Sequence, residues 1–384
     1  MPLDNNRDSM SDTAVFTDRL VISFFSDISD DNIRQFFDSI DLMNAFDGAR
    51  NVADATVIFF RLRVAVTPIP YDFVLAHRRE LEGRGMKSFD YERVSFLPER
   101  IAPTKSVVPV DALVAMNVVA SHSDGAGITI AMLDAGFDIG HPDFIRQRFF
   151  PAPLPQLPLG ILQEHGTHGA GIAAGPLTPT NGSTPRYGVA PAANITLTRV
   201  ITRIAIPDEF ALAGIELAMS NKADIVCMCF GTPVPNGGPF SQPFEDAVSL
   251  AAKDVLLIAA AGNAADTKIH AVEHPANCPS VMAVAALDDQ LRDWDLSCRQ
   301  TNPNQEINVA APGYELLSSL PGATYGRRSG TSPATACVAG IAALWAEAKP
   351  GLRGAALQAE IENACASGTL DRLRAGHGLV QAPP

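Results

Sequence analysis

Three polar residues in separate short segments are of types suited to nucleophilic catalysis. Asp134 follows the apolar run from Ile128 to Leu133, His165 lies in Glu-His-Gly-Thr-His-Gly, and Ser332 lies in Ser-Gly-Thr-Ser-Pro-Ala. A serine hydroxyl is a weak nucleophile, so it needs a base such as histidine within hydrogen-bond reach. A buried carboxylate then orients the imidazole ring and stabilises its cation. Together these residues predict acyl-transfer chemistry through a nucleophilic serine.

The elements that must position these groups can be inferred from the neighbouring sequence. The near-continuous apolar run before Asp134 is typical of a parallel strand covered on both faces, so Asp134 is expected at the carboxyl edge of a sheet. Catalytic groups gather at that edge in open α/β sheets. Residues 333–345 are mostly small and start with proline, which predicts a buried helix. Ser332 would then lie at the helix N-terminus, where free N–H groups favour an oxyanion.

A fourth segment places a side-chain amide after a second predicted strand, as Asp134 follows the first. Residues 255–261 form a second apolar strand, which ends in Gly262 and Asn263. The Asn263 amide can donate a hydrogen bond to the oxyanion that forms when serine attacks, so Asn263 is the candidate oxyanion-hole residue.

With these segments and four others, the chain resembles the subtilisin-like serine proteases, the subtilases, from about residue 113 to the end. The other matching segments are 188–192, 274–284, 310–313 and 376–382. The resemblance implies that Asp134, His165 and Ser332 form a catalytic triad, in the chain order recorded for subtilisin. It also implies an α/β fold with a mostly parallel sheet flanked by helices on both faces, and a serine endopeptidase that works through an acyl-enzyme.

Several positions depart from the family pattern. Ala135 stands where serine or threonine is usual after the aspartate, Gly169 replaces a valine, and Pro333 replaces the methionine after the serine. Ala336-Cys337 replaces a Pro-His pair. None of these changes removes a triad atom or the backbone N–H of Ser332.

The strand at 224–231 has a counterpart in subtilases that runs beside the extended substrate. The resemblance therefore makes Cys229, Phe230, Gly231 and Gly262 candidate substrate-binding residues. A substrate added as a strand draws affinity from main-chain hydrogen bonds and selectivity from side-chain pockets. The stretch 232–243 is either the adjoining loop or an ordinary surface loop.

The first hundred residues predict a separate small α+β domain of ferredoxin-like plan. Residues 1–15 are expected to be extended or disordered, and 16–98 to fold as β-α-β-β-α-β. The expected strands are 19–25, 55–62 and 86–96, with a further strand from 41–52, and the expected helices are 30–40 and 70–82.

Many subtilases carry an N-terminal propeptide of this size, which assists folding and blocks the active site until it is removed. The resemblance makes 16–98 such a propeptide-like inhibitor, 99–112 a linker and 113–384 the catalytic domain. Residues 97–105 would lead into the active site. An uncleaved structural or recruitment domain is the alternative.

Composition restricts the partners and the location. With 29 basic and 42 acidic residues the net charge is −13, which argues against nucleic acid and anionic membranes as partners. No secretory signal and no membrane-spanning run are visible, so a cytoplasmic protein is expected. The six cysteines lie without regular spacing in the second part of the chain, which predicts buried thiols rather than a disulfide framework.

The chemistry requires no cofactor, and a structural calcium ion is the one metal to consider. Asp143 matches a position that often binds calcium in subtilases, although it is equally suited to a turn. The loop 176–187, where a metal-binding loop would lie, holds no carboxylate, so backbone carbonyls would have to supply the other ligands. His165 and His168 could form a metal pair, but apart from Glu164 no further ligand lies nearby.

Two alternative functions remain open from the sequence. One alternative is a peptide-binding protein whose chemistry is impaired by the departures at Ala135, Pro333 or Cys337. The other is a processing protease dedicated to one cytoplasmic precursor peptide. The main prediction is a serine endopeptidase that acts on peptides or proteins.

Overall fold

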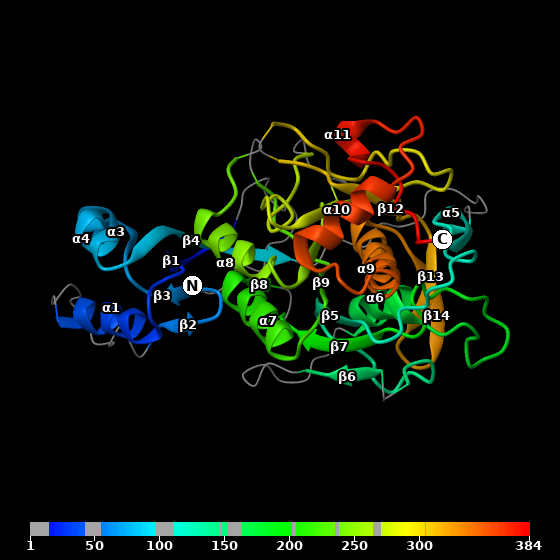
Figure 1. The fold of residues 1–384 in the computed structure, drawn as a ribbon, viewed down its shortest axis with the longest axis horizontal. Coiled ribbons are helices and arrows are strands. Elements are labelled where there is room, and N and C mark those ends of the chain that lie inside the picture. Colours follow the sequence, from blue (N-terminus) through cyan, green and yellow to red (C-terminus); the bar gives the residue numbers. More distant parts are fainter. Residues whose placement is uncertain are drawn as a thin grey trace, which may run out of the picture.

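The computed structural model describes residues 15–42, 55–96, 111–145, 148–152, 163–201, 205–234, 238–263, 270–303 and 305–384. At its centre is a seven-stranded sheet in which all neighbouring strands are parallel (Figure 1). In spatial order its strands are β12 (Val309–Pro312), β11 (Met282–Leu287), β10 (Leu256–Ala260), β9 (Ile225–Met228), β5 (Thr129–Asp134), β7 (Asn194–Arg199) and β6 (Phe149–Pro151). The apolar runs therefore form the predicted sheet, and the predicted α/β fold is confirmed.

Helices cover both faces of this sheet (Figure 1). One face carries α6 (Glu164–Ala174) and α9 (Thr331–Ala348), and the other carries α7 (Asp208–Ser220) and α8 (Gln242–Ala251). Small residues bring α6 and α9 together, since a Cβ at Gly340 would lie 2.9 Å from the carbonyl oxygen of Ala173. The other elements of this part are α5 (Ala112–Ala115), the antiparallel hairpin of β13 (Leu316–Leu320) and β14 (Thr324–Arg328), α10 (Gly354–Ala364) and α11 (Arg372–Ala375).

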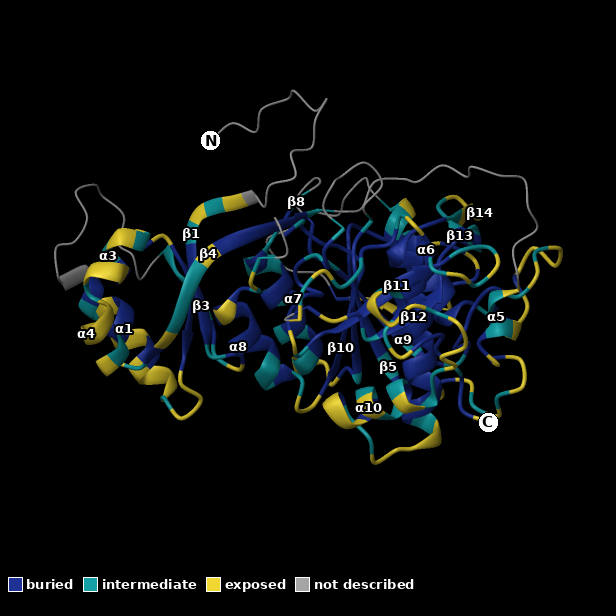
Figure 2. Ribbon diagram, turned by 90° about the horizontal axis from the view of Figure 1, so that it is seen from above, coloured by how far each residue is buried: buried dark blue, intermediate teal, exposed yellow. Residues whose placement is uncertain are grey.

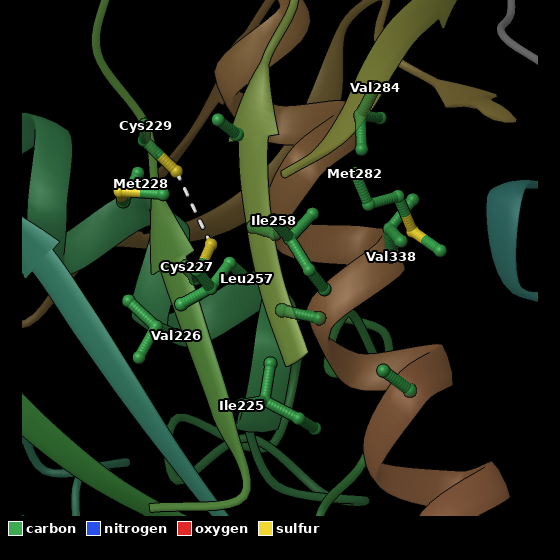
Figure 3. Close-up of a cluster of buried hydrophobic side chains, with 14 of the residues drawn as sticks. Ile225, Val226, Cys227, Met228, Cys229, Leu257, Ile258, Met282, Val284 and Val338 are labelled. Atoms are coloured by element: carbon green, nitrogen blue, oxygen red, sulfur yellow. Dashed lines mark hydrogen bonds between the residues drawn. The ribbon is translucent and has the colours of Figure 1, made fainter. Parts of the chain in front are cut away.

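The core between β9, β10 and α9 contains two thiols (Figure 3). Cys227 and Cys229 lie on the same strand with their sulfur atoms 3.6 Å apart. All six cysteines are free, and Cys365 alone is not fully buried, which confirms the prediction of buried thiols. Hydrogen bonding from Cys227 and burial raise the pKa of Cys229, so its thiol stays protonated and packs as a small apolar group. No helix among the described residues has the length and apolar character to cross a membrane.

The N-terminal part is an antiparallel sheet of the predicted β-α-β-β-α-β plan, with strand order β2-β3-β1-β4. Its elements are β1 (Val15–Phe24), α1 (Asp30–Leu42), β2 (Val57–Phe59), β3 (Val64–Thr67), α3 (Tyr71–Ala76), α4 (Arg78–Gly83) and β4 (Met86–Phe96). Alternation along β1 separates its two faces: Leu20, Ile22 and Phe24 pack in a small core of their own, whereas Val21 belongs to the main core.

Three details of this part differ from the sequence prediction. The helix expected at 70–82 is two short helices that meet at His77. The structure contains a strand that was not predicted, β3. In the range 41–52, where a strand was predicted, residues 41 and 42 end α1, and 43–52 lie outside the described residues. The expected strand at 55–62 is short because the chain turns after Phe59, with Arg63 in a left-handed conformation (φ 50°).

The second face of the N-terminal sheet rests on α7 and α8 (Figure 2). The hydroxyl groups of Ser23 and Ser88 both donate to Asp246 Oδ2 at 2.6 Å, and Lys87 Nζ lies 2.6 Å from Asp246 Oδ1. At the start of α7, the backbone N–H of Glu209 donates to the buried carboxyl group of Glu92 at 3.0 Å. Paired polar groups thus join the two parts of the chain.

Strand β4 extends this contact toward the edge of the central sheet. Val94, Ser95 and Phe96 pair antiparallel with β8 (Ala205–Pro207). On the other side, Phe96 exchanges both backbone hydrogen bonds with Gly231, at 2.8 and 3.1 Å. The end of β4 therefore lies between two segments of the C-terminal part of the chain, as an inserted strand.

Replacing Glu92 with glutamine is expected to remove a pH-dependent cost to folding. Burial raises the pKa of Glu92 from 4.5 to about 7, against the opposing effect of the Glu209 N–H. Between pH 4.5 and about 7, Glu92 loses its proton in the unfolded chain but keeps it in the folded chain. The free energy of unfolding therefore falls as the pH rises through this range, and Glu92 causes no further fall above about pH 7. Urea unfolding in a Ser332→Ala background should show an advantage of Glu92→Gln that grows up to about pH 7 and then stays constant. An advantage independent of pH would contradict this assignment.

Candidate active site

The carboxyl end of β5 and the start of α6 bring Asp134 and His165 together. Asp134 is fully buried, and its Oδ1 and Oδ2 lie 2.8 and 2.9 Å from Nδ1 of His165, whose side chain keeps 26% of its surface exposed. Burial alone would lower the pKa of His165, but the charge and hydrogen bond of Asp134 outweigh it and raise the pKa. The ring is therefore oriented as a base whose protonated form is stabilised.

Ser332 lies in the first turn of α9, as the sequence predicts. Ser332 is buried, with 4% of its surface exposed, and its Oγ donates to the carbonyl oxygen of Cys229 at 3.1 Å. Within the described residues, no hydrogen bond joins Ser332 to His165. The structure thus brings Asp134 to His165 but points the serine hydroxyl toward β9. The Ser332 backbone N–H lies in the helical turn whose N–H groups have no intrahelical acceptor.

Asn263 completes the surroundings of this serine. Its Oδ1 accepts hydrogen bonds from the backbone N–H of Thr331 at 2.9 Å and from the Thr331 hydroxyl at 3.1 Å. Its Nδ2 is buried and has no hydrogen-bond partner among the residues that the structure describes. Thr331, which the sequence analysis did not single out, therefore fixes the amide with its donor side free. A buried donor without an acceptor costs stability unless a ligand supplies the acceptor.

The neighbouring departures from the family pattern leave these groups intact. The backbone N–H of Ala135 donates to Asp134 Oδ1 at 2.6 Å, so the carboxylate has a second donor without a hydroxyl at position 135. His168 faces away from His165: it is buried, lies 3.0 Å from the carbonyl oxygen of Leu316, and burial lowers its pKa to about 4. The part of the chain described here contains no cluster of three potential metal ligands.

The candidate substrate-binding residues lie near Ser332, and they differ in which of their groups a substrate could contact. The side chains of Cys229 and Phe230 are each 1% exposed, so they can offer a substrate their backbone groups. The N–H and carbonyl of Gly231 pair with Phe96, as an added strand would. Gly262 has a φ of 109°, which favours glycine, and its N–H lies 3.3 Å from the hydroxyl of Thr331.

The surroundings of Asp143 do not fit a calcium site. Its Oδ1 accepts from the N–H and hydroxyl of Thr180, both at 2.7 Å, and its Oδ2 accepts from the phenols of Tyr187 at 2.6 Å and Tyr325 at 2.9 Å. Burial opposes ionisation, but these hydrogen bonds outweigh it and lower the pKa of Asp143. Four donors thus occupy both oxygens that a calcium ion would need.

A buried Asp–His pair, a serine at a helix N-terminus and a side-chain amide thus lie at one edge of the parallel sheet. The subtilase family model matches residues 125–378. Subtilisin E of Bacillus subtilis is 32% identical over 242 residues, which cover 62% of this chain and 60% of the relative. Thermitase of Thermoactinomyces vulgaris is 35% identical over 249 residues, which cover 63% and 82%.

The chain belongs to the subtilase family. Among solved structures it is similar to fervidolysin from Fervidobacterium pennivorans, a keratinolytic enzyme related to subtilisin. That likeness has a TM-score of 0.69, covers 97% of this chain and 61% of fervidolysin, and at 19% identity concerns the fold. The matched segment spans about 60% of the length of subtilisin E.

Calcium is not expected to stabilise the protein through Asp143. Any difference in melting temperature between millimolar calcium and excess chelator should be the same for the wild type and Asp143→Asn, because the hydrogen bonds of Thr180, Tyr187 and Tyr325 already satisfy the carboxylate. Asp143→Asn should lower the free energy of unfolding by about 1–3 kcal/mol in both conditions. A calcium-dependent rise in melting temperature that Asp143→Asn abolishes would show that the ion binds here.

Proposed function

We propose that this chain is a serine endopeptidase that cleaves peptide bonds through an acyl-enzyme. The observation that carries the proposal is the free, buried Nδ2 of Asn263, held by Thr331 next to Ser332. An oxyanion would supply the acceptor that this donor lacks. The Asp134–His165 pair provides the base at the same edge of the sheet.

In the proposed mechanism His165 moves protons and Asp134 orients it. Ser332 Oγ bonds to the peptide carbonyl carbon while its proton passes to Nε2 of His165, and the Asn263 amide and the Ser332 N–H stabilise the oxyanion. The C–N bond then breaks as His165 returns the proton to the leaving amine. A water molecule gives its proton to His165, attacks the ester and releases Ser332 with that proton.

Residues 16–98 are, in this proposal, a propeptide-like inhibitor of the catalytic part. The support is strand β4, whose last residues pair with β8 and whose Phe96 pairs with Gly231. Because backbone pairing of this kind is how an extended peptide joins a sheet edge, β4 competes with substrate for Gly231. The proposed domain boundaries are those predicted from the sequence, with 99–112 as linker and 113–384 as the catalytic domain.

A peptide-binding protein without catalysis is the second candidate. One contact favours it: the Ser332 hydroxyl donates to Cys229 rather than to His165. In the endopeptidase proposal, Oγ leaves Cys229 and turns to His165 by rotation about the single Cα–Cβ bond. The two candidates therefore differ in whether this serine becomes nucleophilic.

Treatment with a serine-directed fluorophosphonate is expected to label wild-type protein at Ser332. Intact mass should show one adduct on the wild type and none on Ser332→Ala, because labelling needs a nucleophilic Oγ at that position. If the N-terminal part is removed by self-cleavage, the wild type alone should also lose an N-terminal fragment. Unmodified, full-length masses for both proteins, with no adduct on either, would favour the peptide-binding function.

Asn263→Ala is expected to lower kcat by roughly 10²–10³-fold with little change in KM. The reason is that the amide acts on the oxyanion, which exists in the transition state rather than in the bound substrate. Asn277 offers a matched control, since its Nδ2 is also buried without a partner, and Asn277→Ala should leave kcat unchanged. Hydrolysis of a chromogenic peptide by folded variants measures both constants. Equal losses in the two variants would mean that Asn263 acts through stability.

A further inference from the structure

The ends of β9 and β10 are bridged by a segment that contains an acidic side chain. The backbone N–H of Glu273 donates to the carbonyl of Ala261 at 2.9 Å. The next residue, His274, exchanges two backbone hydrogen bonds with Thr232, at 2.8 and 3.0 Å. Residue 273 therefore lies between the chain that follows β9 and the chain that follows β10.

The side chain of Glu273 occupies the space left by two glycines. A Cβ at Gly231 would contact the Glu273 carboxylate and lie 3.0 Å from its Cβ. A Cβ at Gly262 would lie 2.6 Å from Glu273 Oε1 and in contact with its Cδ. Any larger residue at either position would displace the carboxylate, so these two substrate-binding candidates enclose it.

This carboxylate has no partner within the described residues. No hydrogen bond or ion pair joins its oxygens to another residue in the described ranges. Glu273 keeps part of its surface exposed, yet the surrounding protein removes enough water to raise its pKa to about 8. An enclosed carboxylate without a donor is costly, and a cationic ligand would offset that cost.

The same two segments also flank the reacting groups. The carbonyl of Cys229 accepts from Ser332 Oγ, and Gly231 lies two residues further on, about 7 Å along an extended chain. Asn263, with its free amide, directly follows Gly262. A peptide carbonyl held between Ser332 and Asn263 would therefore direct its own side chain between the two segments, toward Glu273.

We propose that Glu273 determines specificity by binding the basic side chain of an arginine or lysine whose carbonyl Ser332 attacks. The inference rests on the proposed endopeptidase function and names its substrate class. Arginine offers a planar pair of donors to both carboxylate oxygens, and lysine offers a single ammonium group. Both supply the positive charge and the donors that the enclosed carboxylate lacks.

Five peptide substrates that differ only in the residue before the scissile bond test this assignment. They carry arginine, lysine, citrulline, norleucine or alanine, of which citrulline and norleucine match the length of the two bases without their charge. The wild-type protein should cleave the arginine and lysine peptides with kcat/KM at least tenfold above citrulline and norleucine. Glu273→Gln should abolish this preference. Glu306→Gln, the same change at an exposed position, should keep the preference.

Other outcomes would overturn the proposal. If the alanine peptide were cleaved with the highest kcat/KM, Glu273 would fill the pocket itself. If a folded Glu273→Gln variant lost kcat/KM equally on all five peptides, Glu273 would have a structural role. Glu273→Asp keeps the charge and should retain part of the preference if charge is the cause.

Binding to Ser332→Ala separates failure of this inference from failure of the proposed function. Product peptides that end in arginine or citrulline are titrated into this variant by calorimetry. Competition from the chain's own β4 would weaken the binding of both peptides equally, so the ratio of their dissociation constants would not change. Tenfold tighter binding of the arginine peptide supports the pocket even if the wild type neither cleaves nor reacts with fluorophosphonate. Equal binding overturns the pocket, whatever the activity.

Discussion

The parallel direction of β5, β9 and β10 is the constraint on which the rest of the site depends. These strands are neighbours, so their carboxyl ends lie at one edge and deliver Asp134, Cys229 and Gly262 to the same region. Helices α6 and α9 start at that edge and add His165 and Ser332. An antiparallel arrangement would send alternate strand ends to opposite edges. Five distant sequence segments thus meet without any long loop being needed to carry a reacting group.

Burial decides how the groups at this edge behave. Asp134 is fully buried, and both the imidazole of His165 and the backbone N–H of Ala135 contact its carboxyl group. Glu273 has no such partner among the described residues, and burial raises its pKa to about 8. The proposed roles follow from these different partners: Asp134 orients the base, and Glu273 meets the charge of an incoming side chain.

Local sequence predicts those parts of the fold and site that depend on local signals. Residues 128–133 and 255–261 have the continuous apolar character of strands buried on both faces, and Pro333 indicates the start of α9. Contacts between distant segments are not predictable in this way. The four donors around Asp143 come from Thr180, Tyr187 and Tyr325, and no spacing within the chain relates them to each other. Strand β3 was missed because four residues after a tight turn give too short an alternation.

Gly231 links the two functions that this edge combines. Its backbone pairs with Phe96, the last described residue of β4, so it is the point where the N-terminal part meets the catalytic part. Its missing side chain leaves the space that the Glu273 carboxylate occupies. Strand pairing recognises any extended chain, since main-chain groups are common to all residues, whereas the carboxylate can distinguish one side chain from another. In the proposed function, this one glycine therefore allows non-selective backbone binding and selective side-chain binding at adjacent positions. Strand β4 would occupy the backbone position without filling the side-chain pocket.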